Sequence, residues 1–145
     1  MNETASEHQY HQVIFKNIKH DLINSINAMI GYSELILDTL DEAGDRTLER
    51  DMQGIYHSST AILATIQELF SDKTKTGDDI GSVILNEDLH YSIRTPLSSI
   101  IGMSELILED TATVAALDLQ DIQDSVSKIN QAGKRLLRLI NDLSK

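Results

Sequence analysis

An eight-residue string that occurs twice constrains the fold of this chain more than any other feature. Residues 30–37 read IGYSELIL, residues 101–108 read IGMSELIL, and seven of the eight positions are identical. The correspondence extends upstream, where Leu22 is matched by Ile93. Self-similarity of this kind indicates that the chain holds two copies of one structural unit.

Each copy contains two stretches in which apolar residues recur three or four positions apart, the spacing of one helix face. In the first copy these residues are Phe15, Ile18, Leu22, Ile26, Met29, Ile36 and Leu40, then Met52, Ile55, Ser59, Ile62, Ile66 and Leu69. In the second copy they are Leu89, Ile93, Leu97, Ile100, Ser104 and Ile107, then Leu119, Ile122, Val126, Ile129, Gly133, Leu136, Ile140 and Leu143. Each of these rows of residues forms a seam along one face of its helix. Seams with this spacing favour left-handed, nearly antiparallel packing of helices.

Short polar breaks, at 41–45 and at about 110–115, separate the two stretches of each copy. A break this short makes each pair of helices an antiparallel hairpin. A lone hairpin would leave its seam in water, so we expect an all-α, pseudo-dimeric four-helix bundle made of two tandem hairpins. The expected parts are a first hairpin at 1–72, a linker at 73–82 and a second hairpin at 83–145.

Composition narrows the possible functions. Apolar residues make up 41% of the chain and aromatic residues 4%, which suits a bundle core of aliphatic side chains. The formal net charge of −11 repels phosphate backbones and anionic lipids, so we expect no binding to nucleic acid or to membranes. The sequence has no cysteine and no apolar run of membrane-spanning length, and we expect a cytoplasmic protein.

The second copy carries strings typical of a signalling family. Residues 93–105 read IRTPLSSIIGMSE, and residues 132–142 read AGKRLLRLIND. They resemble the phospho-acceptor box and the second helix of the dimerisation and phosphotransfer domain of two-component sensor histidine kinases. Through the internal repeat, the resemblance implies a tandem pair of such hairpins. The sequence shows no glycine-rich phosphate loop of the kinases' ATP-binding domain, so we expect no autophosphorylation from ATP.

The resemblance also indicates where a phosphoryl group would be accepted. The acceptor of the family lies three residues before the arginine of the box, and Tyr91 holds that position in the second copy. The adjacent His90 is about 100° further round the helix, so its use would need a one-residue shift in register. In the first copy His20 holds the acceptor position. Because His20 lies about 200° from Ile18 and Leu22 on the seam, its imidazole should face solvent.

Two residues near His20 match other positions of the family. Asp21 matches the acidic residue that, by resemblance, orients the imidazole or accepts its proton. Asn24 matches the position implied to place a water that hydrolyses phosphorylated receiver domains. Lys16 and Lys19 could supply positive charge to an incoming phosphoryl group. The competing interpretation of all these residues is an ordinary solvated helix surface.

The first copy departs from the family motif at two positions. Ile23 stands in place of the arginine and Ser25 in place of the proline, so no proline can kink the helix after the acceptor. In the repeated strings, we expect Gly31 and Gly102 to permit close approach of the helices.

The leading prediction is a phosphotransfer protein in which His20, assisted by Asp21 and Asn24, exchanges a phosphoryl group with a response-regulator receiver domain or a separate histidine kinase. Two alternatives stay open: a non-catalytic adaptor that binds and modulates such a partner, and a regulatory fragment of a longer hybrid kinase. We expect no metal or cofactor on the chain itself, and Mg²⁺ only on a receiver partner. The duplicated hairpin favours a monomer, although two chains could exchange hairpins to form a swapped dimer.

Overall fold

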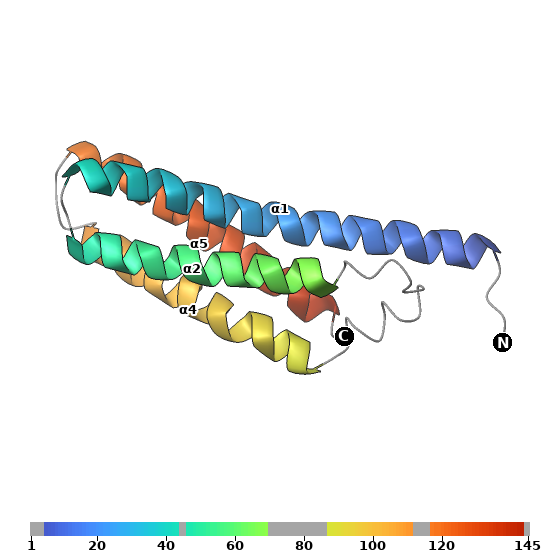
Figure 1. Cartoon of the computed structure of the whole chain (residues 1–145). Helices are drawn as coiled ribbons and strands as arrows, with labels where there is room; N and C mark the ends of the chain where they lie inside the picture. The colour runs from blue at the N-terminus through green and yellow to red at the C-terminus, as the bar shows by residue number, and fades with distance from the viewer. Residues whose placement is uncertain (1–4, 44–45, 70–86, 112–116, 144–145) are drawn as a thin grey trace.

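Four α-helices make up the part of the chain that the computed structural model describes, and this part contains no strand (Figure 1). The helices, which also delimit the described residues, are α1 (Ala5–Ala43), α2 (Arg46–Leu69), α4 (Glu87–Thr111) and α5 (Leu117–Leu143). The predicted all-α class is therefore confirmed.

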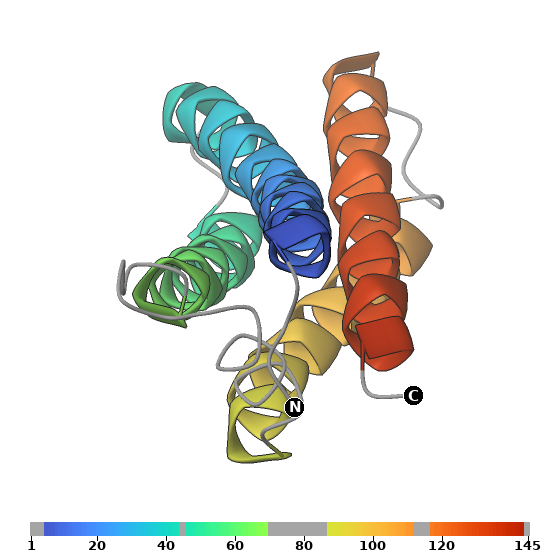
Figure 2. The same cartoon turned by 90° about the vertical axis from the view of Figure 1, so that its right-hand side faces the viewer.

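The helices form a closed ring in the order α1, α2, α4, α5. Helix α1 packs against α2 and α5, and α4 packs against the same two helices. Figures 1 and 2 show that α1 and α4 run in one direction while α2 and α5 run in the other. Each helix therefore has two antiparallel neighbours, one from its own hairpin and one from the other hairpin.

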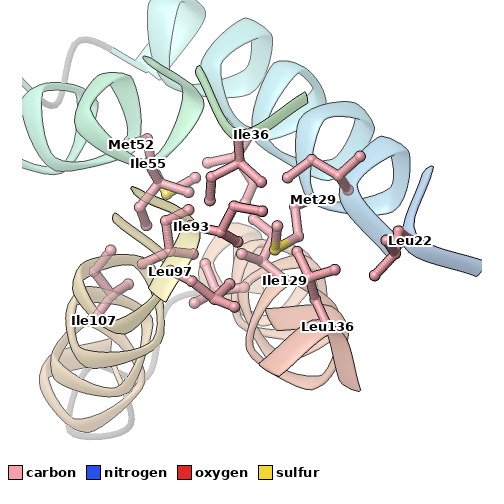
Figure 3. Packing of buried hydrophobic residues seen from close by; sticks show 14 of the residues in the cluster. Leu22, Met29, Ile36, Met52, Ile55, Ile93, Leu97, Ile107, Ile129 and Leu136 are labelled. Atoms are coloured by element: carbon pink, nitrogen blue, oxygen red, sulfur yellow. The ribbon is translucent and has the colours of Figure 1, made fainter. Parts of the chain in front are cut away.

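The core of the bundle consists of the apolar seams read from the sequence. Every seam residue from Leu22 to Leu40 is buried, and so are the described seam side chains of the other three helices (Figure 3). The twelve largest of the fully buried core side chains, Ile26, Met29 and Ile129 among them, are less than 2% exposed. Burial of one aliphatic side chain of this size contributes about 1.5–3 kcal/mol. The seams from all four helices meet in one cluster, so the two hairpins share one core.

Small polar residues interrupt the seams near the middle of the bundle. Ser33, Ser59 and Ser104 are fully buried, and each hydroxyl donates to a backbone carbonyl of its own helix at 2.6, 2.7 and 2.8 Å respectively. Asn130 on α5 adds a bond between helices, because its Nδ2 donates to Ser104 Oγ at 2.9 Å. These bonds offset the cost of burying polar groups in the core.

The predicted role of Gly31 and Gly102 in close helix approach is wrong. Both residues are exposed, and a Cβ atom added to either would meet nothing within 4 Å. The close approach occurs instead at Gly133, which is buried on α5. A Cβ atom there would lie 3.1 Å from Ile101 Cγ1 of α4 and 3.6 Å from Met29 Sδ of α1. Gly133 therefore lets α5 lie against both of its neighbours.

The ends of two helices also differ from the prediction. Helix α1 continues to Ala43, so the break expected at 41–45 is wrong for its first three residues, and α4 continues to Thr111 within the break expected at 110–115. Glutamate and alanine at positions 42 and 43 are good helix formers, which favours this extension. The expected linker at 73–82 lies outside the described residues. None of the described helices is long and apolar enough to cross a membrane.

Candidate functional site

His20 lies on α1 at the point where this helix enters the bundle. Leu22, two residues later, is the first buried side chain among those described on α1, whereas His20 is exposed. The half-turn between these positions places the imidazole on the outer face of the helix, as the seam predicted. A partner molecule can therefore reach the ring.

Asn24 holds the ring of His20 from one helical turn further along. The Asn24 Nδ2 atom lies 3.2 Å from His20 Nδ1. Donation from this amide requires a lone pair on Nδ1 and places the ring proton on Nε2. Rotation of the amide about its Cβ–Cγ bond exchanges nitrogen and oxygen, and Nδ1–H then donates to Asn24 Oδ1 while Nε2 carries the free lone pair. In both arrangements Asn24 occupies Nδ1 and leaves Nε2 to a partner.

The other predicted neighbours of His20 are less closely associated with its ring. Asp21 is half-buried, and the structure records no hydrogen bond between Asp21 and His20. Successive residues point about 100° apart around a helix, which separates the two side chains. Lys16, one turn before His20, is exposed, and Lys19 is half-buried. The structure therefore joins His20 to Asn24 and leaves Asp21 beside the pair.

A groove between α1 and α5 begins at Asn24. Its volume is about 430 Å³, and it is lined by Asn24, Ser25, Ala28, Tyr32, Lys128, Gln131, Ala132, Arg135 and Arg138. Three of these nine residues are basic and none is acidic. Lys128 Nζ lies 5.9 Å from the centre of the Tyr32 ring, a cation–π contact across the groove. Because Asn24 both lines the groove and touches His20, the candidate acceptor stands at the rim of a basic groove.

The three basic residues of the groove are not among the site residues predicted from the sequence. Lys128, Arg135 and Arg138 lie on the exposed side of α5, more than a hundred positions from His20. Their spacing of seven and three residues places them on one stripe of the helix. That stripe could have been read from the sequence, but its position beside α1 follows only from the order of the helices in the ring.

The second hairpin presents no imidazole at the equivalent place. Tyr91, which corresponds to His20, is 74% exposed, whereas His90 is 6% exposed. His90 thus turns toward the bundle, as the 100° step between adjacent residues requires. The arginine and proline of the box lie here on α4: Arg94 is half-buried and Pro96 lies inside the helix.

The first hairpin keeps the histidine but not the proline. Ser25 occupies the corresponding position on α1, where its side chain is 5% exposed. Helix α1 continues through this position without interruption, and Figure 1 shows it as one straight rod. The exposed histidine and the proline inside a helix therefore lie in different hairpins.

The second hairpin is similar in sequence to a known protein family. Residues 85–145 match the family model of the His Kinase A (phospho-acceptor) domain. The matched residues contain α4 and α5. The match supports a histidine-kinase dimerisation and phosphoacceptor domain here, and with it a place in two-component phosphotransfer involving a histidine. No curated protein and no solved structure matches the chain.

Proposed function

We propose that the chain is a two-component phosphotransfer protein in which His20 exchanges a phosphoryl group with an aspartate of a response-regulator receiver domain. The observation that carries the proposal is the contrast between the two hairpins. Within residues 85–145, which match the phosphoacceptor family, the one histidine is His90, and it is buried. The exposed histidine at the equivalent position of the repeat is His20, and Asn24 holds its ring.

The proposed reaction uses the nitrogen that Asn24 leaves free. The Nε2 lone pair of His20 attacks the phosphorus of an aspartyl phosphate, and an N–P bond forms while the P–O bond to the aspartate breaks. The aspartate carboxylate leaves with the bonding electron pair. The positive charge on the phosphorylated ring is stabilised by the Nδ1–H bond to Asn24 Oδ1 until that proton passes to solvent. The reverse sequence returns the phosphoryl group to an aspartate.

Asp21 and the basic groove contribute through their charge. In this proposal the carboxylate of Asp21 stabilises the positive ring of the reaction intermediate through space, since no hydrogen bond joins the two side chains. Lys128, Arg135 and Arg138 attract the acidic surface that surrounds a phosphorylated aspartate. Any Mg²⁺ that neutralises the phosphoryl group would be bound by the receiver domain, and ATP would be bound by a separate kinase.

The proposal is tested by measuring the intact mass of the protein after incubation with phosphoramidate at neutral pH. The wild type should gain one phosphoryl group that is lost in acid, and His20→Gln should gain none. His57→Gln is the matched control, because His57 is also an exposed helical histidine but lies on α2, away from the groove. Circular dichroism should show equal helicity in all three proteins.

A labelled His20→Gln variant would refute the assignment, and so would a folded wild type that accepts no phosphoryl group either from phosphoramidate or from a phosphorylated receiver domain. The second test matters because a receiver can supply groups that a small donor lacks. Transfer is then followed as loss of phosphate from the receiver and appearance of the added mass on this chain.

One observation favours a second candidate, a non-catalytic adaptor. The three basic residues of the groove lie on α5, and His20 is not among the residues that line it, so the groove could bind a receiver domain or a histidine kinase without any chemistry at His20. In that case His20→Ala would bind a receiver domain as tightly as the wild type does, and neither protein would become phosphorylated.

A further inference from the structure

Among the residues that the structure describes, a groove lies at each of the two contacts between the hairpins. The first lies between α1 and α5 and is described above. The second lies between α2 and α4, has a volume of about 150 Å³, and is lined by Arg50, Asp51, Gly54, Ile55, Ser58, Ser99, Ile100 and Met103. The internal repeat relates their α1 and α4 walls, since Ala28 corresponds to Ser99 and Tyr32 corresponds to Met103.

The walls contributed by α2 and α5 correspond as well. When the buried seams of these two helices are aligned so that Met52 matches Val126, Gly54 falls on Lys128 and Ser58 falls on Ala132. Both members of each of these last two pairs line a groove. The two grooves are therefore equivalent places in the pseudo-symmetric bundle.

Charge distinguishes the two grooves. In this alignment the three basic residues of the first groove, in chain order, are replaced on α2 by Gly54, Ala61 and Ala64. All three replacements are exposed. The second groove is lined by one basic and one acidic residue, Arg50 and Asp51, which are adjacent in the chain. The residues that line the first groove thus carry a net charge of three positive units, whereas the charges of Arg50 and Asp51 in the second groove cancel.

The negative charge of the rest of the molecule increases the contrast with the basic groove. The whole chain has a formal net charge of −11, so an acidic protein is repelled by most of its surface. On α5 the positive stripe ends at the exposed residues Asp121 and Asp124, outside the groove lining. A short positive patch in a negative surface directs an acidic partner to one place, and repulsion elsewhere suppresses wrong orientations.

We infer that the bundle binds one acidic partner protein per chain, in the α1/α5 groove, and that the equivalent α2/α4 groove stays empty. The inference rests on the proposed function only in identifying that partner as the receiver domain. A symmetric bundle would offer two such sites. Here the site with the basic stripe is also the site with the exposed histidine, so docking and chemistry coincide on one side.

The probe for this inference is a synthetic poly-glutamate peptide, added at low ionic strength to the ¹⁵N-labelled full chain. Backbone amide shifts should move along α1 and α5 around the groove, should stay unchanged around the α2/α4 groove, and should saturate at one peptide per chain. Shifts at both grooves, or at neither, would overturn the inference. Added salt should weaken the binding, because exposed charges are screened.

Neutral variants test whether the basic stripe is responsible. Arg135→Gln combined with Arg138→Gln should weaken peptide binding roughly tenfold at low salt. Lys134→Gln is the matched control: it removes one charge from the same helix, but Lys134 pairs with Glu105 at 3.2 Å and lies outside the groove. If the control weakens binding as much per removed charge as the double variant does, the effect is one of general charge and the inference is overturned.

The converse variant should create a second site. Gly54→Lys, Ala61→Arg and Ala64→Arg together copy the basic stripe onto α2, and a Cβ atom added at Gly54 would meet nothing within 4 Å. The expected stoichiometry rises from one peptide to two per chain. An unchanged stoichiometry in this variant, with wild-type helicity, would show that charge does not select the groove.

Binding of the peptide in the α1/α5 groove does not depend on phosphorylation of His20. His20→Gln should bind the peptide as the wild type does, because the three basic residues are intact. Groove binding without phosphorylation of the wild type would retain the docking inference and refute the proposed function. Phosphorylation of His20 without groove binding would do the reverse.

Discussion

Three glycines on helices of this bundle should respond in different ways to the same substitution. Gly31 and Gly102 are exposed, with open space where a Cβ would be added, whereas Gly133 is buried between α4 and α1. Replacement by alanine changes each site by one methyl group. The backbone propensity gain is common to all three, so the comparison isolates the effect of packing.

The magnitude follows from the distances. Alanine is favoured over glycine in a helix interior by about 1 kcal/mol, so Gly31→Ala and Gly102→Ala should each raise the free energy of unfolding by about that amount. At Gly133 the new methyl group would lie 3.1 Å from Ile101 Cγ1 and 3.7 Å from Leu97 Cδ1. Overpacking a core costs about 1–3 kcal/mol, which offsets or exceeds the propensity gain.

The assay is reversible urea unfolding followed by circular dichroism. We expect Gly133→Ala to be less stable than Gly31→Ala by at least about 1 kcal/mol, a difference of about 2–4 °C in Tm for a chain of this size. If Gly133→Ala stabilises the protein as much as Gly31→Ala does, the close approach of α5 to α4 at this position is refuted.

Three further predictions concern the acceptor and the core. Tyr91→His should place an exposed imidazole on the second hairpin, with Thr95 one turn beyond it. The mass gained from phosphoramidate should then rise from one phosphoryl group to two. An unchanged mass would show that exposure alone does not make an acceptor. Asn130→Ala removes the bond to Ser104 and should lower the free energy of unfolding by about 1–2 kcal/mol in urea titrations, whereas no change would mean that this bond contributes no net stability. Ile26→Ala empties a fully buried position and should cost about 2–5 kcal/mol, seen as a lower thermal midpoint; a cost below 1 kcal/mol would contradict the burial.

The core was predictable from the sequence because the spacing of apolar residues indicates which face of each helix is buried. Ile26, Ile62 and Ile129 all lie on the seams read from spacing, and all are at most 1% exposed. The same periodicity placed His20 on the outer face. These properties depend on the rotation per residue along one helix, which is fixed by backbone geometry.

The prediction for Gly31 and Gly102 is wrong because recurrence in the two strings does not indicate burial. Gly31 and Gly102 recur in the two strings but face solvent, while Gly133 occupies a seam position that the spacing had already marked. The buried serines show the same principle, since Ser33 and Ser104 belong to the repeated strings and also lie on the seam. Position on the seam, and not recurrence, determines which small residue lies between helices.

The basic groove could not be predicted because its walls come from helices that are distant in the sequence. Asn24 and Arg135 belong to different hairpins, and their proximity depends on α1 packing against α5. Periodicity within one helix carries no information about which helix becomes its neighbour. The contact between Asn24 and His20, by contrast, lies within one turn of α1 and follows from the four-residue spacing.

The presence of all four helices in one polypeptide has a consequence for how the two halves can differ. In a bundle assembled from two identical chains, every substitution appears twice, so a lysine gained on one side is also gained on the other. Here Lys128 has its counterpart in Gly54, and His20 has its counterpart in Tyr91, each encoded separately. Under the proposed function, the α1/α5 side can therefore specialise in recognition and chemistry while the α2/α4 side keeps the packing residues that complete the core.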